Sequence, residues 1–234
     1  MLWLCISLIL VAFIVLVFYI IEKIKAYSIK SVLLKTCVSI LFVMVAAFSS
    51  YHNGAHILHP FIILGLLFGL TGDIWLDLKY VYPKDDKIYT YAGFIVFGIG
   101  HILFITGMYL QFFNNAHPLY AILPFVIALV MGVANQFLAK PLKLDFEDLK
   151  LTTFLYSITL FSLPLCSLSL LLAYGWNSTC LLMLFIGGIL FVISDLVLSG
   201  TYFGEGHERP IDFVLNYLFY YGAQFVIAFS IFFL

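Results

Sequence analysis

The sequence has little charge of either sign. Only 10% of its 234 residues are Asp, Glu, Lys or Arg, and the formal net charge is −1. Roughly a quarter of the residues are charged in soluble domains, so a soluble globule of this composition could not cover itself with polar surface. No basic field favours nucleic acid as a partner, and no feature of the sequence points to an obligate protein partner.

The chain also has few cysteines, and they are scattered without a Cys-x-x-Cys pair. Each lies in or beside an apolar run, which is typical of small packing residues. They are Cys5, Cys37, Cys166 and Cys180. Three histidines near one connection, His52, His56 and His59, lack a carboxylate or thiolate that would complete a zinc site. We therefore predict neither a metal ion nor a cofactor.

Apolar residues make up 64% of the chain and lie in long runs. A helix of ~20 apolar residues crosses the ~30 Å core of a bilayer, and helices pair every backbone polar group within lipid. About eight such runs are present. They lie near residues 2–22, 31–51, 57–77, 91–111, 117–138, 151–173, 179–200 and 212–233. We predict an all-α, multi-pass integral membrane protein, a single membrane domain over residues 1–234, placed in the inner membrane if the source is bacterial.

The first run could be mistaken for a signal peptide. No basic residue precedes it and no small-x-small cleavage site follows it, so we expect a first membrane helix instead.

Basic residues are distributed unevenly over the connections. All eleven Lys and Arg residues lie in or around the first, third, fifth and seventh connections, and none lies in the other three. The positive-inside rule makes the basic side cytoplasmic. Both termini are then expected on the non-cytoplasmic side.

Two acidic residues lie within apolar runs. Asp73 is found in LFGLTGDIWL and Asp195 in LFVISDLVL. A carboxylate at the bilayer centre costs roughly 2.5–3.5 kcal/mol on insertion scales, so such residues usually face the bundle interior and serve a function. Asp77 is borderline, near the end of the third run. The remaining acidic residues, Asp212 among them, lie in loops or at run ends and are expected to be solvated.

Further polar side chains are expected near these two carboxyl groups. Lys35 and Tyr156 begin the second and sixth runs from the basic side and share the depth of the carboxyl groups. Slightly deeper, on the fourth and eighth runs, lie His101, Tyr220, Tyr221 and Gln224. With Ser194, which precedes Asp195, they form the predicted set of substrate-binding or orienting residues.

An internal repeat relates the two halves of the chain. Segment 64–76 aligns with 186–198, 100–105 with 223–228 and 33–40 with 154–161, at nearly constant offset. The alignment places Asp73 over Asp195, His101 over Gln224 and Lys35 over Tyr156. We predict halves at 1–112 and 113–234, each with four helices, related by an axis along the membrane normal.

At these positions the sequence resembles the YhhN family, the lysoplasmalogenases. The resemblance rests on GDIWL (72–76), GHILFI (100–105), Tyr156, LFVISDLVL (190–198) and YYGAQFVIA (220–228), and it extends over nearly the whole chain. Asp77 replaces an expected apolar residue. Lys35 is followed by Thr36, whereas the family has proline after this lysine.

The resemblance implies hydrolysis of the vinyl ether bond of a lysophospholipid held in the membrane. The substrates are 1-alkenyl-glycerophosphocholine and -ethanolamine, and the products are a fatty aldehyde and glycerophosphocholine or glycerophosphoethanolamine. Protonation of the vinyl ether gives an oxocarbenium-like cation that water attacks. This chemistry calls for a general acid and a nearby negative charge, which two buried carboxyl groups in different environments can supply.

The residues then take the following roles as a hypothesis. Asp73 and Asp195 form the catalytic pair. Lys35 or His101 orients one of them or the phosphate. Tyr156, Tyr220 and Gln224 hold water or the glycerol hydroxyl.

Other functions also fit part of the pattern. Repeated halves and buried carboxyl groups are typical of a proton-coupled transporter of a small or lipid-like solute. Helices broken at Gly65, Gly69 and Gly72 or at Gly187–Gly188 would favour that alternative, whereas continuous helices there favour close packing. An intramembrane aspartyl protease is disfavoured, because Asp73 is not preceded by the Gly-x-Gly of its motif.

Overall fold

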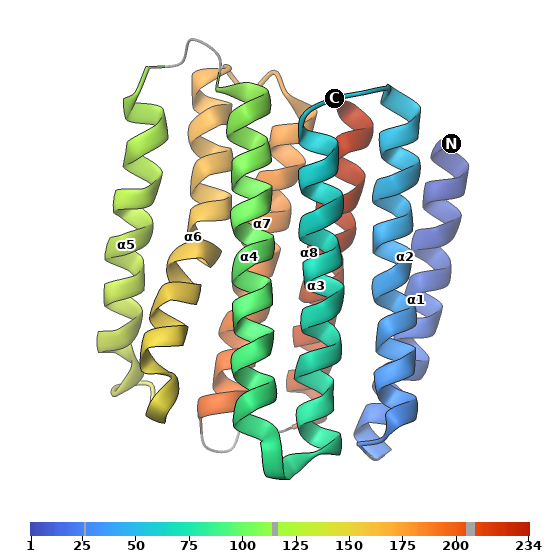
Figure 1. Cartoon of the computed structure of the whole chain (residues 1–234), viewed down its shortest axis with the longest axis vertical. Coiled ribbons are helices and arrows are strands. Elements are labelled where there is room, and N and C mark those ends of the chain that lie inside the picture. Colours follow the sequence, from blue (N-terminus) through green and yellow to red (C-terminus); the bar gives the residue numbers. More distant parts are fainter. Residues whose placement is uncertain (26, 114–116, 205–208) are drawn as a thin grey trace.

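The computed structural model describes residues 1–25, 27–113, 117–204 and 209–234, and within them the fold is a helical bundle (Figure 1). Eight helices of the described residues are long and apolar enough to cross a membrane, which confirms the all-helical prediction and indicates a multi-pass membrane protein. They are α1 (Leu2–Lys25), α2 (Ile29–Asn53), α3 (Leu58–Val81), α4 (Asp86–Phe112), α5 (Leu119–Ala139), α6 (Lys150–Ala173), α7 (Thr179–Phe203) and α8 (Pro210–Ser230). Short 3-10 turns occupy Pro83–Asp85, Glu147–Leu149 and Ile231–Phe233.

Successive helices run in opposite directions, so both termini lie at the same end of the bundle (Figure 1). The opposite end is called the basic end here. It is formed by the last turns of α1, α3, α5 and α7 and the first turns of α2, α4, α6 and α8, where the Lys and Arg residues are found. Its assignment to the cytoplasmic side stays a prediction.

The outermost helices, α1 and α5, present apolar side chains outward. Leu10 of α1 is 60% exposed and Val130 of α5 is 61% exposed, as expected for side chains that contact lipid. On its other side, α5 buries Pro124, Ala128 and Gly132 at intervals of four residues. Apolar burial does not drive helix association in lipid, so small residues that allow close approach hold this helix against α6.

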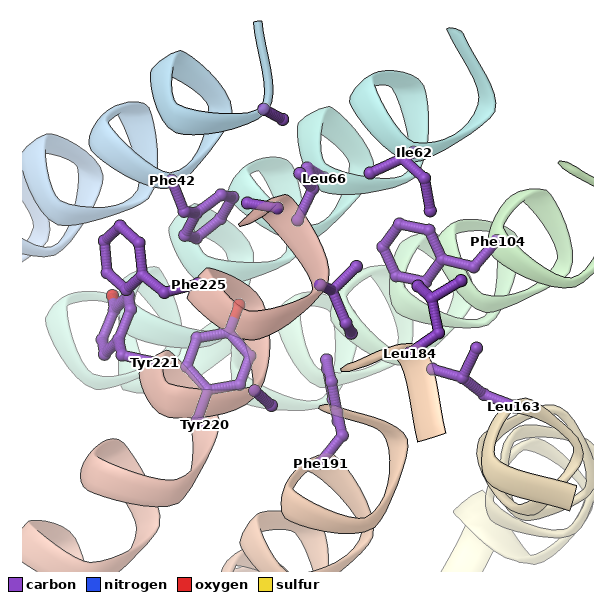
Figure 2. Packing of buried hydrophobic residues seen from close by; sticks show 14 of the residues in the cluster. Phe42, Ile62, Leu66, Phe104, Leu163, Leu184, Phe191, Tyr220, Tyr221 and Phe225 are labelled. Carbon is purple, nitrogen blue, oxygen red and sulfur yellow. The ribbon is translucent and has the colours of Figure 1, made fainter. Parts of the chain in front are cut away.

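The centre of the bundle is filled by large side chains, and those labelled in Figure 2 come from α2, α3, α4, α6, α7 and α8. Phe42 of α2, Phe104 of α4, Phe191 of α7 and Tyr220 of α8 are among them. Helices α3 and α4 approach closely at Gly65, where an added Cβ would lie 3.0 Å from the Gly100 carbonyl oxygen.

The glycine-rich segments do not break their helices. α3 is continuous through Gly65, Gly69 and Gly72, and α7 is continuous through Gly187 and Gly188. A Cβ on Gly188 would lie 2.9 Å from the Pro164 backbone nitrogen of α6, so this glycine admits a neighbouring helix. Close packing, rather than helix breakage, is the role that the structure gives these residues.

The helices are longer than the apolar runs at the basic end. α1 continues to Lys25 and α3 to Val81. Lys23 and Asp77 therefore lie inside helices, whereas hydropathy alone places them at the ends of the apolar runs. The two halves have corresponding neighbours, since α2 packs on α8 as α6 packs on α4. Superposition of the halves stays a prediction.

Candidate functional site

Asp73 lies in a buried network of charge and hydroxyl groups. It is 1% exposed, and its Oδ1 lies 3.2 Å from the Lys35 ammonium of α2. Its Oδ2 accepts hydrogen bonds from Ser39 at 2.6 Å and from Tyr220 of α8 at 2.8 Å. Side chains of α2 and α8 thus hold this carboxylate, and an ammonium group balances its charge, as burial of an ionised group requires.

Asp77, one turn further along α3, belongs to the same network. Its Oδ1 lies 2.8 Å from the Lys23 ammonium of α1 and 3.4 Å from that of Lys35. Tyr19 also donates to this carboxylate, at 3.0 Å from Oδ2. Asp77 is 2% exposed and Lys23 is 3% exposed. Lys23, expected in or around the first connection, therefore lies buried within α1, and the borderline Asp77 is an interior residue.

Within the network two ammonium groups face two carboxylates. The sequence signal for this arrangement was the departure at Asp77 from the apolar residue expected in the family. A charged residue one helical turn after Asp73 lies on the same face of α3. Lys23, directly after the end of the first run, was available to pair with it.

Asp195 has very different surroundings. Its carboxyl group accepts a hydrogen bond from the Tyr156 hydroxyl of α6. Among the residues that the structure describes, no basic side chain forms an ion pair with it. The Tyr156 ring packs against Phe94 at a centroid distance of 5.0 Å. An apolar site with one hydroxyl donor and no cation favours a neutral carboxylic acid.

Both carboxyl groups nevertheless line one narrow cavity between the helices. Its walls include six of the predicted site residues. These are Lys35, Asp73, Tyr156, Ser194, Asp195 and Tyr220. Phe97, Phe191 and Leu198 supply apolar surface to the same cavity, and Tyr217 and Asn216 of α8 also line it.

A second, more apolar cavity adjoins the first. The two share Tyr156 and Asp195, together with Phe94, Leu198 and Tyr202. The second cavity extends along Leu160 and Phe161 of α6 toward Phe203 at the end of α7. Asp195 therefore stands where a polar cavity meets an apolar one.

Three predicted residues lie outside the walls of the shared cavity. Tyr221 hydrogen-bonds to Ser39 Oγ and donates to the Lys35 carbonyl oxygen, both at 3.4 Å, so it contacts the network from behind. Gln224 donates to the Tyr220 hydroxyl at 2.9 Å. His101 bonds through Nδ1 to the Phe97 carbonyl oxygen at 2.8 Å, and its ring packs against Phe191.

Asn216 fixes the position of Ser194. Its amide donates to the Ser194 carbonyl oxygen at 2.9 Å and to the Ser194 hydroxyl at 3.1 Å, joining α8 to α7 beside Asp195. Asp212 is 7% exposed and pairs with Arg209 at 2.9 Å, so its expected solvation is wrong. A carboxylate at the start of a helix is stabilised by the helix dipole, and here it also hydrogen-bonds to the Arg209 backbone amide.

The histidines near the α2–α3 connection are engaged in local contacts. His52 stacks on Phe232, and His59 hydrogen-bonds to Ser50 at 2.9 Å. Within residues 1–25, 27–113, 117–204 and 209–234, no three His, Cys, Asp or Glu side chains come together as metal ligands.

The model of the YhhN family matches residues 30–231, which is most of the chain. Neither a curated protein nor a solved structure matches it.

Proposed function

Because the chain belongs to the YhhN family, we propose that it hydrolyses the vinyl ether bond of lysoplasmalogens inside the membrane. The substrates would be 1-alkenyl-glycerophosphocholine and 1-alkenyl-glycerophosphoethanolamine. One observation carries the proposal: Asp73 and Asp195 line a single cavity, and among the described residues a cation lies beside Asp73 only.

This difference assigns the two roles that the reaction needs. Asp195, in apolar surroundings and with no cation beside it in the part of the chain that the structure describes, is the proton donor. Asp73, paired with Lys35, is ionised and supplies negative charge. Two carboxyl groups with separate roles set by their environments are a recurring solution for acid catalysis near neutral pH.

The reaction proceeds in three steps. Asp195 transfers its proton to the β-carbon of the vinyl ether, and the adjacent carbon and oxygen share the resulting positive charge. The Asp73 carboxylate stabilises that cation across the cavity. Water adds to the carbon bonded to oxygen and returns a proton to Asp195, after which the hemiacetal separates into a fatty aldehyde and the glycerol hydroxyl.

The site suits a lipid with one chain and a polar head. Asp195 lies eight positions before Phe203, roughly 12 Å from the end of α7 along the helix axis. The adjoining apolar cavity along Leu160 and Phe161 can take the first carbons of the alkenyl chain. The proposed substrate is thus processed near the membrane boundary at the basic end, with its head toward the loops.

A product assay with purified protein tests the proposal. The protein is incubated with an alkenyl lysolipid and with an acyl lysolipid of the same head group, and products are identified by mass spectrometry. We expect fatty aldehyde from the first and no fatty acid from the second. Fatty acid release without aldehyde would replace this reaction with ester hydrolysis.

The transporter alternative is separated by a second measurement. Continuous α3 and α7 give no unwound segment at their glycines of the kind that favours a carrier. Uptake of alkenyl lysolipid or its head group into sealed proteoliposomes, driven by a proton gradient and without aldehyde formation, would support transport instead.

A further inference from the structure

A polar pocket opens at the basic end, directly beyond the two carboxyl groups. Its walls come from α3, α4, the α5–α6 connection and the end of α7. The residues that matter here are Lys79, Asp86, Lys87, Thr90, Asp145 and Tyr202. We call it the interfacial pocket.

The pocket brings together two ammonium groups and two carboxylates. Lys79 extends over the Tyr202 ring, with its Nζ 3.3 Å from the ring centroid. The Asp86 carboxylate accepts from the Lys87 backbone amide at 2.7 Å. A mixed set of charges on one concave surface is complementary to a zwitterion, whose phosphate and ammonium need opposite partners.

The wall from the α5–α6 connection is held in place by the end of α7. The Asp145 backbone amide donates to the Phe203 carbonyl oxygen at 2.9 Å, and Leu144 forms an isolated antiparallel bridge with Gly204. Lys143 has a positive φ of 56°, a conformation that is costly for a residue with a Cβ and that persists only when its surroundings impose it. The carboxylate of Asp145 is therefore carried by a fixed segment of chain.

The pocket adjoins the cavities that contain the carboxyl groups, because it shares wall residues with both. Tyr202 lines all three, and Phe146 and Phe203 line both the interfacial pocket and the apolar cavity. Lys79 follows Asp73 by six positions in α3, which is roughly 9 Å along the axis. In a lysolipid the phosphorus and the vinyl carbons are separated by about the length of two extended residues, about 7 Å. The length of the Lys79 side chain accounts for the difference between these two distances.

We propose that the interfacial pocket binds the zwitterionic phosphodiester head group of the lipid, with Lys79 and Lys87 on the phosphate and Asp86 and Asp145 facing the ammonium. This inference rests on the proposed function for the identity of the substrate. It goes further by naming the residues that recognise the head group and the side of the cavity on which the head group lies.

The test measures binding apart from turnover. The full chain, purified in a maltoside detergent that contains no phosphate, is titrated with a saturated 1-alkyl-lysophosphocholine and with a 1-alkylglycerol of equal chain length. Neither ligand has a vinyl ether, so binding is read whether or not the protein releases aldehyde. Glycerophosphocholine, which has the same head group without a chain, is the third ligand.

We expect the wild-type protein to bind the alkyl-lysophosphocholine at least about tenfold more tightly than the alkylglycerol, because charge-assisted hydrogen bonds hold the phosphate. The double variant K79Q/K87Q should lose this advantage and bind the alkylglycerol as before. The Lys87 side chain is 55% exposed, and its ammonium group pairs with the Asp148 carboxylate at 3.1 Å. Exposed ion pairs contribute little to stability, so Lys87→Gln alone should lose part of the advantage without disturbing the fold. Lys79→Arg should keep most of it.

The matched control is K25Q/K84Q. It removes two exposed lysines from the same end of the molecule that do not line the interfacial pocket, and it should leave all three affinities unchanged. Equal loss in the control and in K79Q/K87Q would overturn the proposal in favour of a general charge effect. Glycerophosphocholine that binds as tightly as the lysolipid would overturn it in favour of a site for soluble phosphodiesters. If the expected binding pattern is found without aldehyde release, the proposed reaction is wrong and the proposed head-group site stands.

Discussion

The two halves of the bundle surround corresponding aspartates in opposite ways. In the first half Asp73 lies beside the Lys35 ammonium, and in the second half Asp195 lies beside the Tyr156 hydroxyl. The sequence alignment of the halves pairs these same positions. The partner of the aspartate is thus a cation in the first half and a neutral hydroxyl donor in the second. The comparison shows how two halves of one bundle can present a carboxyl group beside a cation and another beside a neutral donor to one cavity.

The largest expected effect tests the neutral side of this comparison. Asp195→Asn removes the proton donor but keeps an oxygen that accepts from Tyr156, so aldehyde release should fall 10²–10⁴-fold, as is typical for loss of a general acid. Thermal unfolding of the variant in detergent should stay close to that of the wild type.

Asp85→Asn, at an exposed acidic residue of the basic end, is the control and should retain full activity. Asp73→Asn should also lose activity, and in addition lose stability, because Lys35 then lacks its nearest carboxylate. Normal aldehyde release by Asp195→Asn would remove this residue from the mechanism.

The next effect compares the partners of the two aspartates. Lys35→Met leaves Asp73 and Asp77 with Lys23 alone, and breaking a buried ion pair costs roughly 3–5 kcal/mol of unfolding free energy. Tyr156→Phe removes one hydrogen bond to a neutral group and should cost about 1–3 kcal/mol. Denaturant titration of both variants in one detergent measures the difference. Equal losses of unfolding free energy would contradict the difference in charge between the surroundings of Asp73 and those of Asp195.

A smaller, coupled effect sharpens the description of the first half. Lys23→Met and Asp77→Leu each leave a buried charge without its partner and should destabilise the protein. The double variant removes the pair together and keeps Lys35 with Asp73, and such replacements of buried pairs are often neutral. We expect a coupling free energy of about 0.5–3 kcal/mol in the double-mutant cycle, with aldehyde release preserved in the double variant. Additive losses would show that Lys23 and Asp77 act independently.

The smallest effect concerns His101 and the residue aligned with it, Gln224. His101→Gln introduces the side chain that the second half has at this position. The amide can still donate to the Phe97 carbonyl oxygen, so stability should change by no more than about 1 kcal/mol. Aldehyde release should fall less than about tenfold, well short of the loss of a general acid. A loss as large as that of Asp195→Asn would give His101 a direct catalytic role.

Most of the fold could be predicted from the sequence because few backbone structures can cross a bilayer. Runs of apolar residues fix the number of helices, and alternating basic connections fix which helix ends share a side. Depth along a helix follows from residue count. The common depth of Asp73, Asp195, Lys35 and Tyr156 could therefore also be predicted. Helix ends were less certain, since polar residues such as Asp77 continue a helix beyond its apolar run.

Sequence alone determined that carboxyl groups lie inside an apolar bundle, since insertion of a charge into lipid is unfavourable and interior positions are the alternative. Only the tertiary structure decided which carboxyl group has a cation, because the Lys23 and Asp77 partners are 54 positions apart and meet through side chains of different helices. The rotation of each helix about its axis, set by packing of residues such as Gly65 and Phe104, determines whether an ammonium group reaches a given carboxylate. That rotation arises from contacts between helices, which no single run of residues specifies.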